Sequence, residues 1–194
     1  MDASSEIAKW RLCLEGDRST CQICASSQLE ILELDPEPII GVLHKWRVEY
    51  VVIGGIAATF HGSTTVTRDF DICYSRERAN LERLASALRE LDARLRDVDV
   101  EVPFQLDAAS LRNGLNFTFK TKHGDFDCFG DPGGGFDYEL LKRNADRMDV
   151  AGRKVMVASL DDIIAMKRAA GRNKDRIEVE NLSALREVRD KGRR

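Results

Sequence analysis

Residues 54–72 read GGIAATFHGSTTVTRDFDI, and no other segment of the chain is as informative. Near its end, Asp69 and Asp71 open a predicted strand that runs to about Tyr74. Because successive side chains of a strand point to opposite faces, both carboxylates are expected on one face, with their Cα atoms about 6.6 Å apart. Two carboxylates at this spacing repel each other when alone and can share one small hard cation, Mg²⁺ or Mn²⁺.

The beginning of the same segment predicts a place for phosphate. The short apolar run Tyr50–Ile53 is expected to be a buried strand, and Gly54 and Gly55 follow it, before a short helix that ends near His61. Glycines let the backbone of a turn approach a phosphate, and a helix N-terminus favours an anion. Acids that hold a metal beside a phosphate cradle are typical of phosphoryl or nucleotidyl transfer. Solvated carboxylates at a strand end are the alternative interpretation of the acid pair.

The rest of the chain predicts an α/β fold, in which helices pack against a sheet. Apolar residues recur at helical spacing over residues 76–95, which indicates a long amphipathic helix. Further helices are expected to begin after Asp35 and Ser159, which can cap them, and at Asp175.

A hairpin is predicted between these helices. Residues 116–122 and 125–129 both alternate with period two and are joined by a glycine-containing turn. Asp125 and Asp127 share one face of the second strand. Asp125 is next to the turn and is expected to be solvated, whereas Asp127 lies in mid-strand, where its alternative role is that of a surface carboxylate.

A lysine continues the apolar stripe of the helix that begins after Ser159. Lys167 lies seven residues after Leu160, on the side expected to face the core. A buried lysine is unfavourable unless it reaches water or an anion. A nucleotide phosphate would satisfy Lys167, and extension to water at the helix end is the alternative. Arg172 follows Gly171, which stops the helix, and is either a second phosphate contact or a helix-end charge without a chemical role.

Two blocks of the sequence carry a family resemblance. The first consists of Gly54, Gly55, Ala57, His61, Gly62, Thr67, Asp69 and Asp71, and the second spans residues 165–175. Together they resemble the polymerase-beta-type nucleotidyltransferase superfamily, and most closely its AbiEii-like branch of toxin–antitoxin nucleotidyltransferases. The resemblance extends over about residues 37–185. It implies a mixed sheet flanked by helices, with a helical C-terminal part.

The resemblance also implies an activity. The expected reaction is metal-dependent transfer of a nucleoside monophosphate from a nucleoside triphosphate, such as ATP, to an acceptor hydroxyl. Mg²⁺ or Mn²⁺ is expected on Asp69, Asp71 and Asp127, with Asp127 as general base and Lys167 neutralising developing charge. The nucleotide-binding residues implied are Gly54, Gly55, Ser63, Thr67, Lys167 and Arg172.

Several acceptors are compatible with this activity. The branch implies an RNA 3′ end, such as that of tRNA, or a protein side chain, and a cognate antitoxin as a partner. In some relatives the antitoxin modifies the residue at the place of Thr67. A small-molecule acceptor of the antibiotic type and a catalytically silent binding module of the same fold are the alternatives.

Length and composition are those of an ordinary cytoplasmic protein. The chain has 194 residues, of which 43% are hydrophobic and 32% charged. It has no apolar run of the roughly 20 residues that cross a bilayer, and its first residues lack the basic and apolar pattern of a secretion signal, so a cytoplasmic location is expected. Three parts are expected: an N-terminal extension over residues 1–34, a nucleotidyltransferase core over 35–158 and the helical C-terminal part over 159–194. Five cysteines are an odd number and argue against a disulfide framework.

Charge is distributed unevenly along the chain. Residues 141–194 contain 15 Lys and Arg against 9 Asp and Glu, a net charge of +6, although the whole chain carries −3. The basic segment could contact the phosphates of RNA, and a solvated helical surface is an equal alternative.

Overall fold

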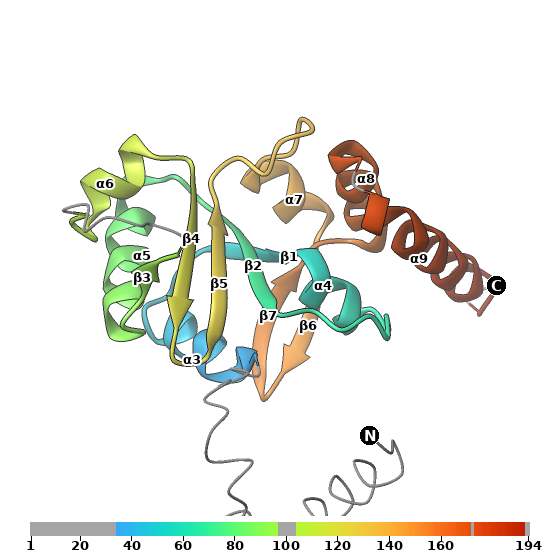
Figure 1. The fold of residues 1–194 in the computed structure, drawn as a ribbon. Coiled ribbons are helices and arrows are strands. Elements are labelled where there is room, and N and C mark those ends of the chain that lie inside the picture. Colours follow the sequence, from blue (N-terminus) through green and yellow to red (C-terminus); the bar gives the residue numbers. More distant parts are fainter. Residues whose placement is uncertain (1–33, 97–103, 172, 193–194) are drawn as a thin grey trace, which may run out of the picture. The chain divides into compact units, whose positions relative to one another are not determined.

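In the computed structural model, the described residues build a seven-stranded mixed sheet in the order β3-β4-β5-β2-β1-β7-β6 (Figure 1). These are residues 34–96, 104–171 and 173–192, and they all belong to the larger of two units of the chain. The predicted extension up to Leu34 therefore lies almost wholly outside the described residues. The strands are β1 (Tyr50–Ile53), β2 (Asp69–Tyr74), β3 (Arg94–Leu95), β4 (Asn116–Thr121), β5 (Gly124–Phe129), β6 (Asp146–Val150) and β7 (Arg153–Val157).

The central strands mix both directions. β1 is antiparallel to β2 and parallel to β7, whereas β2 is parallel to β5. The outer pairs, β3 with β4, β4 with β5 and β6 with β7, are antiparallel. In the parallel pair, Asp69 lies opposite Asp125 and Asp71 lies opposite Asp127. The fold class predicted from the sequence, a mixed sheet flanked by helices, is confirmed.

Helices connect and cover these strands (Figure 1). α8 packs on α4, and α9 packs on α8. No helix among the described residues is long and apolar enough to cross a membrane. The helices are α3 (Pro36–Lys45), α4 (Gly54–Phe60), α5 (Arg78–Glu90), α6 (Ala108–Asn113), α7 (Tyr138–Asn144), α8 (Leu160–Ala170) and α9 (Asn173–Gly192).

Local capping signals set several helix ends as predicted. The side chain of Asp35 accepts a hydrogen bond at the start of α3, and that of Ser159 accepts one from the backbone N–H of Asp162 at the start of α8. Gly171 ends α8 in the left-handed conformation, with φ of 62°.

The helix predicted over residues 76–95 is wrong at its C-terminal end. α5 ends at Glu90, and Asp92 turns the chain with a φ of 49°. Leu95 then lies in β3 opposite Phe119 of β4. Pairing with a strand that is distant in sequence thus overrides the helical spacing of the leucine.

The core follows the alternation of β2 and β5. Phe70 and Phe126 are fully buried, with ring centroids 5.7 Å apart. They occupy the strand positions between the aspartates, so the apolar face packs inward while the acids lie on the other face. Burial of these rings therefore fixes the register on which the acid cluster depends.

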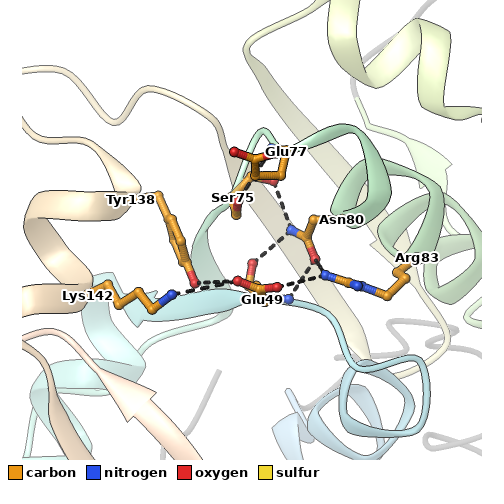
Figure 2. Close-up of polar contacts among 7 residues, drawn as sticks. All are labelled: Glu49, Ser75, Glu77, Asn80, Arg83, Tyr138 and Lys142. Atoms are coloured by element: carbon orange, nitrogen blue, oxygen red, sulfur yellow. Dashed lines mark hydrogen bonds and ion pairs between the residues drawn. The ribbon is translucent and has the colours of Figure 1, made fainter.

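A buried asparagine joins α5 to the ends of β1 and β2 (Figure 2). Asn80 is fully buried and donates from Nδ2 to the carbonyl oxygens of Glu49 (2.9 Å) and Ser75 (2.8 Å). Its Oδ1 accepts from the backbone N–H of Glu49 at 2.7 Å. Since Glu49 precedes β1 and Ser75 follows β2, one side chain satisfies backbone groups of both connections.

We predict that Asn80→Ala lowers the free energy of unfolding by about 2–4 kcal/mol, because it removes three buried hydrogen bonds to backbone groups. Urea denaturation followed by circular dichroism measures the change. Arg78→Ala is the matched control on the same helix, since its side chain is 87% exposed, and it should change stability by less than about 0.5 kcal/mol. Equal stability of the two variants would contradict the structural role of Asn80.

Candidate active site

A cleft of about 400 Å³ opens where β1 ends and β2 begins. Its walls come from the turn between β1 and α4, the loop before β2, the strands β2 and β5, and the helices α8 and α9. The charged residues that line it are Asp69, Asp71, Asp127, Lys167, Asp175 and Glu178.

The register of β2 and β5 brings the predicted acids together. Asp69 and Asp71 line the cleft from β2, and Asp127 lines it from β5, directly opposite Asp71. Paired residues of neighbouring strands point to the same face, so three carboxylates meet at one edge of the cleft. Their proximity is set by strand pairing across more than 50 positions of sequence.

Burial and mutual repulsion perturb two of these acids. The pKa of Asp71 is raised to about 7, first because the carboxyl is buried and then because Asp127 and Asp69 are close to it. The pKa of Asp127 is raised to about 6, again mainly by burial, although Arg96 opposes the shift. Near neutral pH, the cluster therefore holds less negative charge than its number of carboxyls suggests, and a cation would restore that charge.

The glycine pair packs directly against this cluster. Gly54 has a φ of 67°, and a Cβ atom there would lie only 1.9 Å from Oδ2 of Asp71. A Cβ on Gly55 would lie 2.6 Å from Oγ1 of Thr67. The backbone N–H of Gly55 donates to the Asp71 carboxylate, and the Thr67 hydroxyl contacts the carbonyl oxygen of Asp69 at 3.4 Å. Both glycines are thus required for the turn to approach the acids.

Arg96, which follows directly after β3 and was not predicted from the sequence, forms ion pairs with the acids. Nη1 of Arg96 lies 2.6 Å from Oδ2 of Asp125, and Nη2 lies 3.0 Å from Oδ2 of Asp127. Nη1 is also 3.6 Å from Oδ1 of Asp69. The expectation that Asp125 is merely solvated is therefore wrong, because it is an ion-pair partner of this guanidinium. No sequence signal marks Arg96, since its position depends on β3 pairing with β4.

The carboxylate oxygens at this edge of the cleft are of the kind that binds a hard divalent cation. Asp69 and Asp71 offer carboxylate oxygens, and Oδ1 of Asp127 is buried without a hydrogen-bond partner. Among the residues that the structure describes, however, no three His, Cys, Asp or Glu side chains lie so that they could hold one metal ion together. The other oxygen of Asp127 is engaged by Arg96, so Asp127 would join a metal only if that contact loosened.

Lys167 lies in the cleft and is paired with α9. Its Nζ is 2.7 Å from Oε2 of Glu178 and 3.7 Å from Oδ1 of Asp175, and its side chain is 14% exposed. The anion that a core-facing lysine needs is thus supplied within the chain. The role of Lys167 toward a nucleotide phosphate stays a prediction.

One predicted nucleotide-binding residue, Ser63, is not brought to the cleft. Ser63 lines a separate hollow together with Asn181 and Leu185 of α9, and its hydroxyl accepts from the backbone N–H of Thr65 at 3.3 Å. Arg172 lies outside the described residues.

His61, part of the first motif, is a structural residue in this geometry. Its ring is buried, with Nε2 2.8 Å from the carbonyl oxygen of Ala158 and Nδ1 2.7 Å from Nη1 of Arg189. Burial lowers its pKa. The histidine therefore joins α4 to α9 in its neutral form.

Comparison with solved structures identifies the class of fold. The chain has the fold of a nucleotidyltransferase. The lincosamide antibiotic adenylyltransferase LnuA, solved with lincomycin bound, superposes with a TM-score of 0.54 at 13% identity, over 79% of this chain and 99% of LnuA. No family model and no curated protein matches the sequence.

Two further solved structures are more distant in shape. A protein from Thermotoga maritima that is proposed to be a nucleotidyltransferase has a TM-score of 0.49 at 17% identity, over 81% of this chain and 96% of its own. The antibiotic-resistance factor ANT(2'')-Ia has a TM-score of 0.47 at 16% identity, over 80% of this chain and 89% of its own.

The raised pKa of Asp71 predicts how stability depends on pH. Its pKa rises from 3.8 to about 7 on folding, so the folded protein prefers the protonated acid and loses stability as pH rises from about 4 to about 7. Asp71→Asn removes this loss, and in EDTA it should raise Tm at pH 8 by several degrees and flatten the pH profile. Thermal unfolding between pH 4 and pH 8 measures both effects.

The matched control is Asp92→Asn, because that side chain is 74% exposed. It should leave the profile unchanged. If the Tm of Asp71→Asn at pH 8 equals or falls below the wild-type value, the ionised carboxylate of Asp71 does not destabilise the folded protein.

Proposed function

We propose that this chain is a metal-dependent nucleotidyltransferase, which moves a nucleoside monophosphate from a nucleoside triphosphate to an acceptor hydroxyl and releases pyrophosphate. The observation that carries this proposal is the acid cluster. Asp69, Asp71 and Asp127 meet at one edge of a cleft, against a turn whose two glycines have no room for a side chain. The likeness of the fold to an adenylyltransferase supports it.

Each residue of the cluster has a distinct role in this proposal. Asp69 and Asp71 hold Mg²⁺ or Mn²⁺, which when bound neutralises charge on the reacting phosphate. Asp127 accepts the proton of the attacking hydroxyl, because its pKa of about 6 leaves it ionised yet basic at neutral pH. Lys167 exchanges Glu178 for phosphate oxygens as the triphosphate enters the cleft.

The main candidate for the acceptor is an RNA 3′ end. The motif resemblance to toxin–antitoxin nucleotidyltransferases supports tRNA as that RNA and a cognate antitoxin protein as a partner. The basic segment 141–194 supplies positive charge for an RNA backbone. In this proposal the protein acts in the cytoplasm, where tRNA and nucleoside triphosphates are available.

The second candidate is a small-molecule acceptor. Five acidic side chains and one lysine line the cleft, so it favours a cationic acceptor over a polyanion. LnuA, which shares the fold, is a lincosamide antibiotic adenylyltransferase.

One experiment tests the activity and separates the acceptors. The purified chain is incubated with each α-³²P-labelled nucleoside triphosphate and Mg²⁺, together with total RNA, a protein lysate, or a panel of lincosamides and aminoglycosides. Label in tRNA supports the first candidate, and label in an antibiotic supports the second. No EDTA-sensitive transfer to any acceptor would reject the proposed activity and favour a silent binding module.

We predict that Asp69→Asn and Asp71→Asn each reduce transfer by roughly 1,000-fold or more, because each removes a ligand of the proposed metal. Both variants should remain folded by circular dichroism. Asp161→Asn is the matched control, since its side chain is 71% exposed and outside the cleft. Near-wild-type transfer by either cleft variant would reject the metal assignment.

For Lys167→Ala we expect a loss of at least ~30-fold in kcat/KM, which corresponds to a charge-assisted phosphate contact of about 2 kcal/mol. Arg168→Ala, at the exposed neighbouring position, should keep wild-type kinetics. If Lys167→Ala instead lowers Tm and leaves the kinetics unchanged, the lysine serves only to pair with Glu178.

A further inference from the structure

A second cavity, of about 540 Å³, lies at the other end of β1. It opens to the surface and is bordered by α3 and α7, by the residues that lead into β1, and by the hairpin of β6 and β7. Tyr50 begins β1 and lines this cavity, whereas Ile53 ends β1 and lines the cleft. Three strand residues correspond to about 10 Å, and the two cavities share no lining residue.

Positive charge converges on this second cavity. Its lining contains four lysine and arginine side chains and one histidine, contributed by separate segments of the chain, but only one acid, Glu49. Such an excess is not a property of the whole protein, whose net charge is −3. These basic residues are His44, Arg47, Lys142, Arg147 and Lys154.

The single acid is already occupied by other partners (Figure 2). Oε1 of Glu49 accepts from Arg83 at 2.8 Å, and its Oε2 lies 3.4 Å from the hydroxyl of Tyr138 and 3.7 Å from Nζ of Lys142. Lys154 has an acid of its own, since its Nζ lies 3.0 Å from Oδ2 of Asp149. Within the described part of the chain, neither Arg47 nor Arg147 has an acidic partner.

The backbone at Arg47 is strained, and a glycine at this position would relieve the strain. Arg47 follows Trp46, the C-cap of α3, and has a φ of 53°. Glycine is the usual residue at this place, because a Cβ atom makes the left-handed conformation unfavourable. The chain instead places a guanidinium there, at the rim of the cavity. Packing does not require it, since Arg47 is exposed.

The remaining lining suits a planar, partly apolar group. It consists of Ile40, Val48, Tyr50, Tyr138, Val155 and Met156. Nζ of Lys142 lies 5.1 Å from the ring centroid of Tyr138, so cationic and aromatic groups adjoin within the site. A cavity of this size with an apolar lining and a few converging charges has the properties of a ligand site.

We propose that this second cavity binds a nucleoside phosphate, with the base against the apolar lining and the phosphate on Arg47 and Arg147. The ligand is either a free mononucleotide or a nucleotide unit of an RNA chain. This site is separate from the cleft, and binding there does not require nucleotidyl transfer. It also gives a location for part of the basic segment, because Lys142, Arg147 and Lys154 belong to it.

The test is equilibrium binding of two probes, adenosine 5′-monophosphate and penta-adenylate, by calorimetry in EDTA and 0.15 M salt. Without a divalent ion, the carboxylates of the cleft repel phosphate, so the second cavity dominates binding. Salt at this concentration suppresses non-specific attraction. Binding of the mononucleotide indicates a small-molecule site, and binding of the pentamer alone indicates an RNA strand.

Arg147→Glu and Arg47→Gly should each weaken binding of the bound probe by about tenfold or more, since each removes a charge-assisted contact. Arg143→Glu is the matched control, because Arg143 is exposed on α7 but does not line the cavity. Arg47→Gly should also raise Tm, as glycine relieves the backbone strain. Weaker binding in a more stable protein distinguishes ligand contact from damage to the fold.

Three results would overturn the proposal. One is that wild type binds neither probe, and a second is that Arg147→Glu and Arg47→Gly bind as wild type does. The third is that Arg143→Glu loses as much affinity for the probe as the two cavity variants do. That result would mean that the overall surface charge, and not the cavity, determines binding. Each result leaves the proposed nucleotidyl transfer unaffected, because that activity is measured separately with Mg²⁺ and an acceptor.

Discussion

The parallel pairing of β2 with β5 is the constraint on which the rest of the site depends. Because Asp71 lies opposite Asp127, the two acids share one face of the sheet, where burial first and neighbouring carboxylates second raise the pKa of each. The sheet can maintain this repulsion because Phe70 and Phe126 lock the register from the opposite face. Hydrophobic burial thus supplies the stability that holds an unfavourable cluster of charge in place.

The charges around the cleft are balanced by internal pairs. Arg96 engages acids of β2 and β5, and Lys167 engages acids of α9. In the proposed activity each of these pairs would be exchanged, since a metal would compete with Arg96 for the same carboxylates, and a phosphate would compete with Glu178 for the lysine. The two exchanges would reinforce each other under this proposal, because a nucleotide that carries its own metal would bring both replacements at once. In this proposal, Arg96 thus takes the place of the metal and Glu178 takes the place of the phosphate when no substrate is bound.

The features that could be predicted from the sequence are those set by residues close to one another along the chain. Strand alternation placed Asp69 and Asp71 on one face, and capping marked the start of α8 at Ser159. The sequence could not place Arg96, whose approach requires the short strand β3 to pair with β4, nor the end of α5, where Asp92 breaks a helical pattern. Glu178 was missed as partner of Lys167 for the same reason, since the contact depends on how α9 packs on α8.

The close approach of Gly54 to Asp71 links the two positions in any redesign or divergence of this protein. A side chain at position 54 and a carboxylate at position 71 need the same space. A variant that acquires alanine at 54 must therefore first shorten or move the residue at 71, and a variant that loses the acid frees the glycine to change. Substitutions at positions 54 and 71 are therefore coupled, because residue 71 must change before residue 54 can. As long as Asp71 is kept, position 54 is restricted to glycine.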